Sequence, residues 1–347
     1  MRYGCFVLLA FAVAGCIKPF QADARLSLMT PITANVKAEF EKENSGPLVE
    51  MPVEGQEIGH GPTVAIIDVD GLILNDNLTG PMSAGENPVD LFRARLDAAA
   101  ADPKVSAVVV RINSPGGGVT ATDIMWRELN SFRAKTKVPV VACIMDLGCG
   151  GAYYLATASD MIVAHPTSIT GGIGVILNLY NLQDTLNLFS IVSQSIKAGK
   201  NIDMGSVLDA LPDDTKVMLQ KMADDFHTRF QDIVKKGRPQ VDLDKGNTFD
   251  GRIFTAPQAL KLKLIDRIGY MDDALAAARA LAKQPQAKAV VFHRCRDEAR
   301  TPYAITANFP LQSSILPVSI PGIDRSRLPT FLYLWQVDPT LQRFSGK

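Results

Sequence analysis

Short apolar runs alternate with amphipathic stretches through the middle of the chain. The runs that predict strands are Thr63–Val69, Val105–Ile112, Val138–Met145 and Met161–Ala164, and the first two are typical of strands buried in a sheet. The stretches between them that have helical spacing are Pro88–Ala101, Thr122–Arg133 and Ala152–Ser159. Strands and helices that alternate in this way predict an α/β domain with a mostly parallel sheet, flanking helices and right-handed crossovers.

The alternation weakens toward the C-terminus. Further helices are expected at Thr215–Lys235, Ala256–Leu264 and Met271–Lys283, and a strand at Val290–Phe292. We therefore divide the chain into a polar tether at 17–61, a folded domain at 62–285 and a C-terminal extension of unassigned role at 286–347. Within the extension, Phe331–Trp335 is too apolar for a free tail, so we expect it to pack on the domain or on a neighbouring subunit.

The N-terminus has the features of an export signal. Arg2 precedes the apolar run Phe6–Ala14, which is far shorter than the roughly 20 residues that span a bilayer. The run ends at Val-Ala-Gly-Cys, which resembles a bacterial lipoprotein signal in which Cys16 is lipidated. The alternative is an ordinary signal peptide with a chance cysteine. Residues 1–16 thus predict a protein of the bacterial cell envelope, lipid-anchored on the extracytoplasmic side of a membrane.

Composition narrows the classes of function. Lys+Arg and Asp+Glu both number 36, and no segment is rich in basic residues, which argues against a nucleic-acid partner. Cys143, Cys149 and Cys295 remain if Cys16 is acylated, and an odd number of thiols argues against a disulfide framework. The four histidines are scattered without ligand spacing, so neither a metal nor another cofactor is expected.

Three glycine-containing loops follow successive predicted strands. They are Asn113–Gly118, Gly148–Ala152 and Thr170–Val175. Glycines in the first, Gly116 and Gly117, allow backbone N–H groups to point into one cavity, as an oxyanion hole or a peptide-binding turn requires. The second opens a helix, whose free N–H groups favour an anion or a thiolate.

The order and spacing of these loops make a family recognisable. Arg111–Val175 resembles the bacterial signal peptide peptidase A (protease IV) family, within the Clp protease/crotonase-like superfamily. The matching stretches are Arg111–Gly117, Tyr153-Tyr154, Ala158–Asp160, Thr170-Gly171, Ile173–Val175, Ile196–Gly199, Gly251–Thr255, Gln258–Leu260 and Leu264–Gly269. The resemblance covers about residues 62–285. It implies the Clp protease/crotonase-like fold, a serine nucleophile with a lysine base, cleavage of signal-peptide remnants or short unfolded chains, and assembly into rings of subunits.

The chain departs from the family at the reactive positions. The resemblance places the nucleophilic serine at Gly150 and the lysine base at Ile202. A serine that often orients the lysine is replaced by Gly172. Glycine has no nucleophile and isoleucine accepts no proton, so the resemblance implies that the usual dyad is lost.

One alternative keeps a catalytic role. Cys149 lies one residue before the vacant nucleophile position, at a helix N-terminus where the pKa of a thiol can fall. Lys200 lies two residues before the vacant base position. Against this pair, neighbouring helical residues point about 100° apart, and a free cysteine usually behaves as a small buried residue.

Two hypotheses follow. In the first, the protein is a non-catalytic subunit that binds extended peptides or signal-peptide remnants, as a homo-oligomer or with an active paralogue. In the second, it is a hydrolase, either a peptidase that uses Cys149 or an enzyme of another chemistry in the same pocket. A crotonase-like acyl-thioester enzyme is a remoter option, for which the sequence offers no coenzyme A site.

Overall fold

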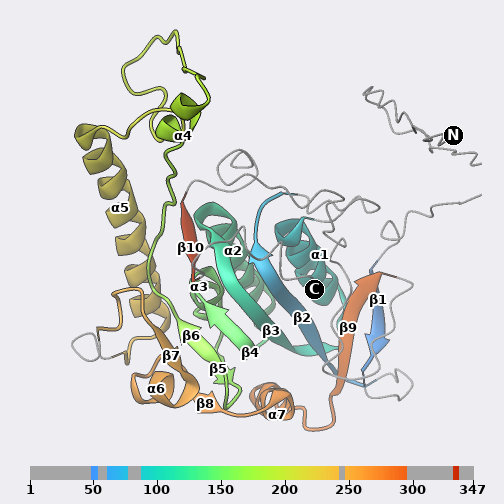
Figure 1. The fold of residues 1–347 in the computed structure, drawn as a ribbon. Helices are drawn as coiled ribbons and strands as arrows, with labels where there is room; N and C mark the ends of the chain where they lie inside the picture. The colour runs from blue at the N-terminus through green and yellow to red at the C-terminus, as the bar shows by residue number, and fades with distance from the viewer. Residues whose placement is uncertain (1–47, 54–60, 77–86, 242–246, 295–330, 336–347) are drawn as a thin grey trace, which may run out of the picture. The chain divides into compact units, whose positions relative to one another are not determined.

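The computed structural model describes residues 48–53, 61–76, 87–241, 247–294 and 331–335 (Figure 1). The strands are β1 (Leu48–Pro52), β2 (Thr63–Ile73), β3 (Val105–Gly118), β4 (Val140–Cys149), β5 (Met161–Ala164), β6 (Ile169–Gly171), β7 (Ile253–Thr255), β8 (Arg267–Ile268), β9 (Lys288–Arg294) and β10 (Leu332–Leu334). The helices are α1 (Pro88–Ala101), α2 (Val119–Thr136), α3 (Gly151–Ala156), α4 (Gln183–Leu188), α5 (Asp213–Gly237), α6 (Ala256–Lys261) and α7 (Met271–Leu281).

The strands form one sheet whose interior is parallel. Its order is β1-β9-β2-β3-β4-β5-β8, and β6 continues beside the end of β4. Neighbours from β9 to β8 along this order run parallel, while β1–β9, β3–β10 and β6–β7 are antiparallel. The predicted α/β architecture with a mostly parallel sheet is therefore confirmed.

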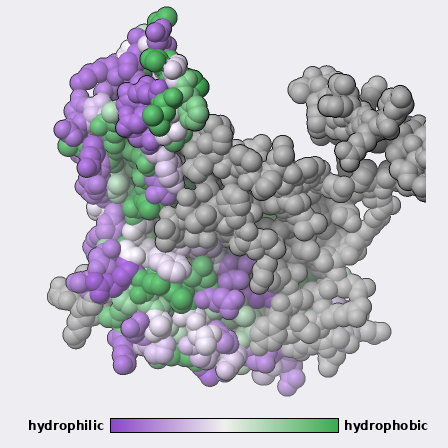
Figure 2. Space-filling view, in the orientation of Figure 1, coloured by the Kyte–Doolittle hydropathy of each residue, from purple (hydrophilic) through white to green (hydrophobic). Residues whose placement is uncertain are grey.

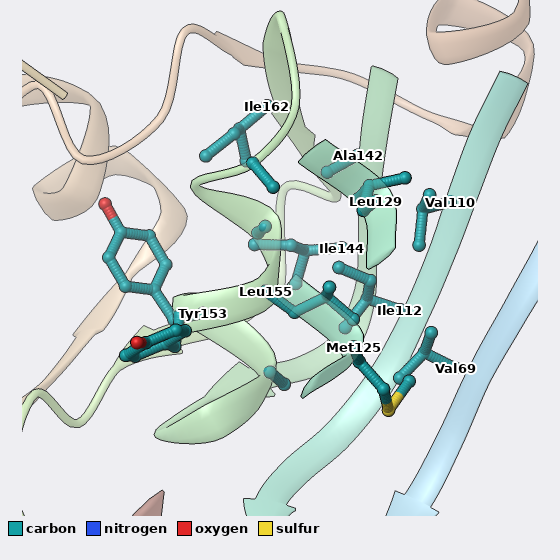
Figure 3. Packing of buried hydrophobic residues seen from close by; sticks show 14 of the residues in the cluster. Val69, Val110, Ile112, Met125, Leu129, Ala142, Ile144, Tyr153, Leu155 and Ile162 are labelled. Carbon is teal, nitrogen blue, oxygen red and sulfur yellow. The ribbon is translucent and has the colours of Figure 1, made fainter. Parts of the chain in front are cut away.

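Helices cover both faces of the sheet, and alternation along each strand separates two cores. On one face, strand residues such as Val110 and Ala142 pack with Met125 and Leu129 of α2 (Figure 3). On the other face, strand residues such as Val109 pack with α7. Because both faces of the inner strands are buried, these strands are almost uniformly apolar, which is why their positions were visible in the sequence.

The predicted helices are present with small shifts at their ends, and α1 and β5 match their predicted bounds. The start of α1 is fixed by Asn87, whose side-chain oxygen accepts a hydrogen bond from the N–H of Val89 at 2.9 Å, and by Pro88 in the first turn. Of the helices in the described residues, none is long and apolar enough to span a bilayer.

Three predictions about segment ends need correction. β2 does not stop at Val69, the predicted end, but continues to Ile73 through a register shift between Asp70 and Leu72. The residues 113–118, expected as a loop, extend β3 to Gly118. Leu48–Pro52, expected within the polar tether, pairs with β9 as β1, so the tether prediction does not hold there. The remaining tether residues up to 47 and the predicted lipoprotein signal lie outside the described residues.

The predicted C-terminal extension contributes two strands. β9 includes the expected strand Val290–Phe292 and lies beside β2. β10 lies within the apolar patch Phe331–Trp335 and pairs with the glycine-rich end of β3. The patch therefore packs on the domain, which is one of the two placements expected for it.

Candidate functional site

The backbone at Gly150 makes a sharp turn from β4 into α3. Its φ of +54° and ψ of −124° belong to a region that residues with a Cβ adopt only under strain. Its N–H donates to the carbonyl oxygen of Gly171 at 2.9 Å, which fixes the turn. Strained strand-to-helix turns of this kind are a common way to expose a nucleophile. The backbone therefore makes a turn of the kind that can present a nucleophile, but Gly150 has no side chain that could act as one.

The space beside Gly150 is filled by the chain's own C-terminal strand. A Cβ placed on Gly150 would lie 2.3 Å from the carbonyl oxygen of Tyr333 and 2.7 Å from its carbonyl carbon. The Tyr333 carbonyl therefore lies in the space that a side chain at residue 150 would need. The same Cβ would also overlap that carbonyl oxygen, so β10 and a side chain at residue 150 exclude one another.

Gly116 and Gly117, the predicted oxyanion or peptide-binding residues, pair with this strand. Gly116 lies opposite Leu334, and Gly117 lies opposite Tyr333. Only glycine fits at either position. A Cβ at Gly116 would lie 2.0 Å from the Tyr333 carbonyl oxygen, and a Cβ at Gly117 would lie 2.0 Å from the Ile73 carbonyl oxygen. These contacts on both sides explain why the glycine-rich stretch is a strand rather than the expected loop.

The strand is also paired on its second edge. The N–H of Ile176 donates to the Leu332 carbonyl oxygen at 3.0 Å, and the N–H of Leu332 donates back at 3.1 Å. At its ends, the Val119 N–H donates to Phe331 at 3.3 Å and the Trp335 N–H donates to Pro115 at 3.0 Å. Residues 331–335 are therefore held between two backbone edges, as an extended peptide is held when it adds a strand to a sheet.

Tyr333 fills an aromatic pocket and is fully buried. Its ring stacks on Tyr154 at a centroid distance of 5.4 Å and lies against Phe230 at 4.7 Å. Its hydroxyl donates to the carbonyl oxygen of Phe226 at 2.8 Å. Burial raises the pKa of Tyr333, which keeps this donor protonated. The pocket comes from α3 and from the C-terminal half of α5.

A charged pair fixes one wall of this pocket. The Tyr154 hydroxyl donates to Asp123 of α2 at 2.5 Å, and Arg229 of α5 pairs with the same carboxylate at 2.7 Å. Burial and the hydrogen bond to Asp123 both raise the pKa of Tyr154. The network ties α2, α3 and α5 together around the aromatic rings.

Cys149 has the environment of a structural thiol. The residue is fully buried, and its Sγ lies 3.5 Å from the Ile169 carbonyl oxygen, to which the thiol donates. Burial raises the pKa of Cys149 to about 12. The expected lowering of this pKa is outweighed, because desolvation of the buried thiolate raises the pKa more than the backbone hydrogen bond at Gly148 lowers it.

Lys200 and Ile202 lie in the segment between α4 and α5. The Lys200 ammonium pairs with Asp214 at 2.7 Å, which raises its pKa and keeps it charged, and 79% of its side chain is exposed. Ile202 is 73% exposed.

This segment is distant from Gly150. Asp214 lies near the start of α5, whereas Phe230, which contacts the pocket, lies 16 residues later, about 24 Å along a helix. Figure 1 likewise shows the segment at the end of α5 away from α3. Within one chain, the two predicted dyad positions are not brought together.

Gly172, where the resemblance predicts a serine that orients the lysine, lies beside Gly150. A Cβ at Gly172, where φ is +63°, would lie 3.2 Å from the Gly150 nitrogen and 3.2 Å from the Trp335 Cβ. The structure thus groups Gly116, Gly150 and Gly172 around one strand. The aromatic pocket was not predicted from the sequence, although the apolar patch Phe331–Trp335 and the pair Tyr153-Tyr154 both contribute to it.

Comparisons with known proteins agree with this fold. Residues 132–285 match Peptidase family S49. The chain is 32% identical over 227 residues to "Protease 4" of Salmonella typhi, a match that covers 65% of this chain and 36% of the relative. It is 30% identical over 233 residues to "Serine protease SPPA, chloroplastic" of Arabidopsis thaliana, covering 66% of this chain and 34% of the relative. The match therefore spans about a third of either relative.

The match, the parallel sheet with its flanking helices and the strand-to-helix turn at Gly150 agree with one another. The protein has an α/β fold with a mostly parallel sheet, its residues 132–285 match peptidase family S49, and the chain is similar to signal peptide peptidase A proteins.

Proposed function

We propose that this protein is a non-catalytic, peptide-binding member of the family. The observation that carries the proposal is the contact between Gly150 and Tyr333. The nucleophile position has no side chain, and its Cβ space is filled by a carbonyl group of the chain itself. A groove that holds a strand by backbone hydrogen bonds needs no nucleophile to bind peptides, so binding can persist after catalysis is lost.

The rival peptidase would use Cys149, and its environment argues against that role. A thiol whose pKa is about 12 has almost no thiolate at neutral pH. The side chain is fully buried, whereas a nucleophile must reach a substrate carbonyl. Lys200, its suggested base, is charged, exposed and paired with Asp214.

The expected assembly has support from the surface of the α4–α5 region. Large apolar side chains are exposed there, among them Leu188 at 85% and Phe189 at 71%, with Ile191, Val192, Ile196 and Val217. Figure 2 shows apolar and polar residues mixed over this part of the molecule. Apolar residues gathered on one surface mark interaction sites. We propose a second subunit, another copy or an active paralogue, as its partner, and anchoring through a lipid on Cys16 in the cell envelope.

Hydrolysis of a quenched fluorescent peptide tests the proposal. The wild type is compared with Cys149→Ala, and Cys143→Ala serves as a matched control because Cys143 is also buried with a pKa raised to about 12. We expect no turnover by any of the three proteins. Turnover that disappears in Cys149→Ala but not in Cys143→Ala would establish the peptidase hypothesis.

A further inference from the structure

Residues 331–335 occupy the groove as a bound peptide would. Both edges of the segment are hydrogen-bonded to the domain, one to β3 and the other to Ile176. Leu332 and Leu334, on either side of Tyr333, are 5% and 9% exposed, while Trp335 at the end is 37% exposed. The segment therefore shows which ligand chemistry the groove accepts.

The centre of the groove recognises a phenol ring. Two aromatic rings hold the Tyr333 ring, and the Phe226 carbonyl accepts its hydroxyl proton. That carbonyl lies within α5, and a carbonyl oxygen has a second lone pair for a further donor beyond the helical hydrogen bond. The pocket thus offers a ring-shaped apolar space that ends in a hydrogen-bond acceptor.

We infer that the groove binds, in exchange for residues 331–335, an extended segment of another polypeptide that carries a tyrosine at the position of Tyr333 between apolar neighbours. This inference rests on the proposed peptide-binding function and names the ligand class for it. Backbone pairing supplies affinity that does not depend on sequence, and the aromatic pocket supplies selectivity. The C-terminal strand competes with this ligand.

The hydroxyl contact sets the degree of selectivity. A phenylalanine keeps the ring contacts but loses the hydrogen bond, so it binds about 3- to 10-fold more weakly. An alanine also loses the ring contacts, so its binding is weaker by more than about a hundredfold. A phosphotyrosine is excluded, because its phosphate carries no hydroxyl donor at this position and would meet a backbone carbonyl.

The chain's own strand makes wild-type binding weaker than binding to an emptied groove. A ligand on the same chain has an effective concentration of the order of millimolar. An external peptide must displace it, so removal of the Tyr333 side chain opens the site.

The test uses the full chain, as wild type and as Tyr333→Ala, with Trp335→Ala as a control whose side chain lies outside the aromatic pocket. Fluorescence anisotropy measures binding of a labelled peptide with the sequence of residues 330–336, Thr-Phe-Leu-Tyr-Leu-Trp-Gln. Matched peptides carry Phe, Leu or Ala in place of the central Tyr. We expect Tyr333→Ala to bind the Tyr peptide at least about tenfold more tightly than the wild type or Trp335→Ala, and to prefer Tyr over Phe over Ala.

The outcomes separate the inference from the function on which it rests. Equal binding of the Tyr, Leu and Ala peptides would overturn the inference and leave peptide binding intact. Failure of every peptide to bind would overturn peptide binding itself. Mass spectrometry of the recovered peptide adds a third readout: selective binding followed by cleavage would support the inference and contradict a non-catalytic function.

A second measurement covers the case in which Tyr333→Ala does not fold. Wild-type protein is mixed with millimolar peptide, and limited proteolysis reports the accessibility of residues 331–335. We expect the Tyr peptide to expose the segment to cleavage and the Ala peptide to leave it protected. Equal protection with both peptides would overturn the inference.

Discussion

The two positions at which the resemblance predicts the family's dyad residues lie in opposite environments. Gly150 is enclosed, with the Tyr333 carbonyl in the place of its missing side chain. Ile202 is 73% exposed on the segment between α4 and α5. A lysine at residue 202 would meet open solvent, whereas a serine at residue 150 would meet backbone.

This difference shows that packing constrains residue 150 but not residue 202. The absence of a base at residue 202 has no counterpart in the packing of the described residues. The absence of a nucleophile at residue 150 is linked to β10, because glycine and the strand fit only together. The groove beside Gly150 holds residues 331–335 of the same chain.

The largest expected contrast concerns the reactivity of Cys149. Its pKa rises from the ordinary 9.0 to about 12, so the thiolate fraction at neutral pH falls about a thousandfold. We expect alkylation by iodoacetamide in the native protein to be slower by at least this factor than in urea, as followed by peptide mass spectrometry. Lys200, by contrast, is exposed on the segment between α4 and α5. It should react with an acylating reagent as fast as a free lysine that has the same fraction of uncharged amine. Native alkylation of Cys149 at the unfolded rate would contradict the enclosed environment.

The same shift predicts how stability depends on pH. The unfolded thiol loses its proton near 9.0 and the folded thiol near about 12, so the unfolded state is favoured increasingly as the pH rises between these values. Unfolding in urea at a series of pH values should show this loss, and Cys149→Ala should make it less steep. A wild type and variant with parallel pH profiles would argue against a buried thiol.

Gly150→Ser should destabilise the protein by about 2–5 kcal/mol, as measured by urea unfolding. Positive φ costs a residue with a Cβ about 1–2 kcal/mol, and overlap with the Tyr333 carbonyl adds about 1–3 kcal/mol. Gly199→Ser is the matched control, since Gly199 has a φ of +100° with nothing within 4 Å of its Cβ position. Equal losses of unfolding free energy in the two variants would mean that β10 does not contact a side chain at residue 150.

Tyr333→Phe isolates the hydroxyl in the pocket. Loss of its hydrogen bond to Phe226 should cost about 1 kcal/mol of unfolding free energy, because the ring contacts remain. Tyr270→Phe, at a tyrosine that is 52% exposed, should change stability by less than about 0.5 kcal/mol. If Tyr333→Phe left the free energy of unfolding unchanged, the hydroxyl would not be hydrogen-bonded to its acceptor.

Ile202→Lys should have the smallest effect, within about 0.5 kcal/mol in thermal or urea unfolding, since the side chain is solvated. It should also add no peptide hydrolysis, because residue 150 still has no nucleophile. A loss above about 1 kcal/mol would show that Ile202 is covered in solution, as contact with a second subunit would do.

The elements that follow from local pattern were predictable from the sequence. α1 begins and ends at the residues that its helical spacing predicts, Pro88 and Ala101, and β5 coincides with Met161–Ala164. The strand-to-helix turn at Gly150 was also placed correctly, because an apolar strand, glycines and a helix follow one another along the chain.

The other features of the fold and the site depend on contacts between residues that are distant in the sequence. The stretch ending at Gly118 has low strand propensity and becomes a strand only because Ile73 and Tyr333 pair with it from either side. β1 lies within residues 17–61, which were predicted as a polar tether. It is a strand because it pairs with β9, about 240 residues later in the chain. The raised pKa of Cys149 depends on burial, which a short local motif does not report.

Amide hydrogen exchange of residues 331–335 and of Val119 and Ile176 tests the central claim most directly. Those amides that donate across the groove, at Val119, Ile176, Leu332 and Trp335, should be protected in the wild type and should lose protection together in Tyr333→Ala. Exchange of Leu332 and Trp335 at the rate of an unstructured peptide in the wild type would contradict the account, because it would mean that the groove beside Gly150 is empty.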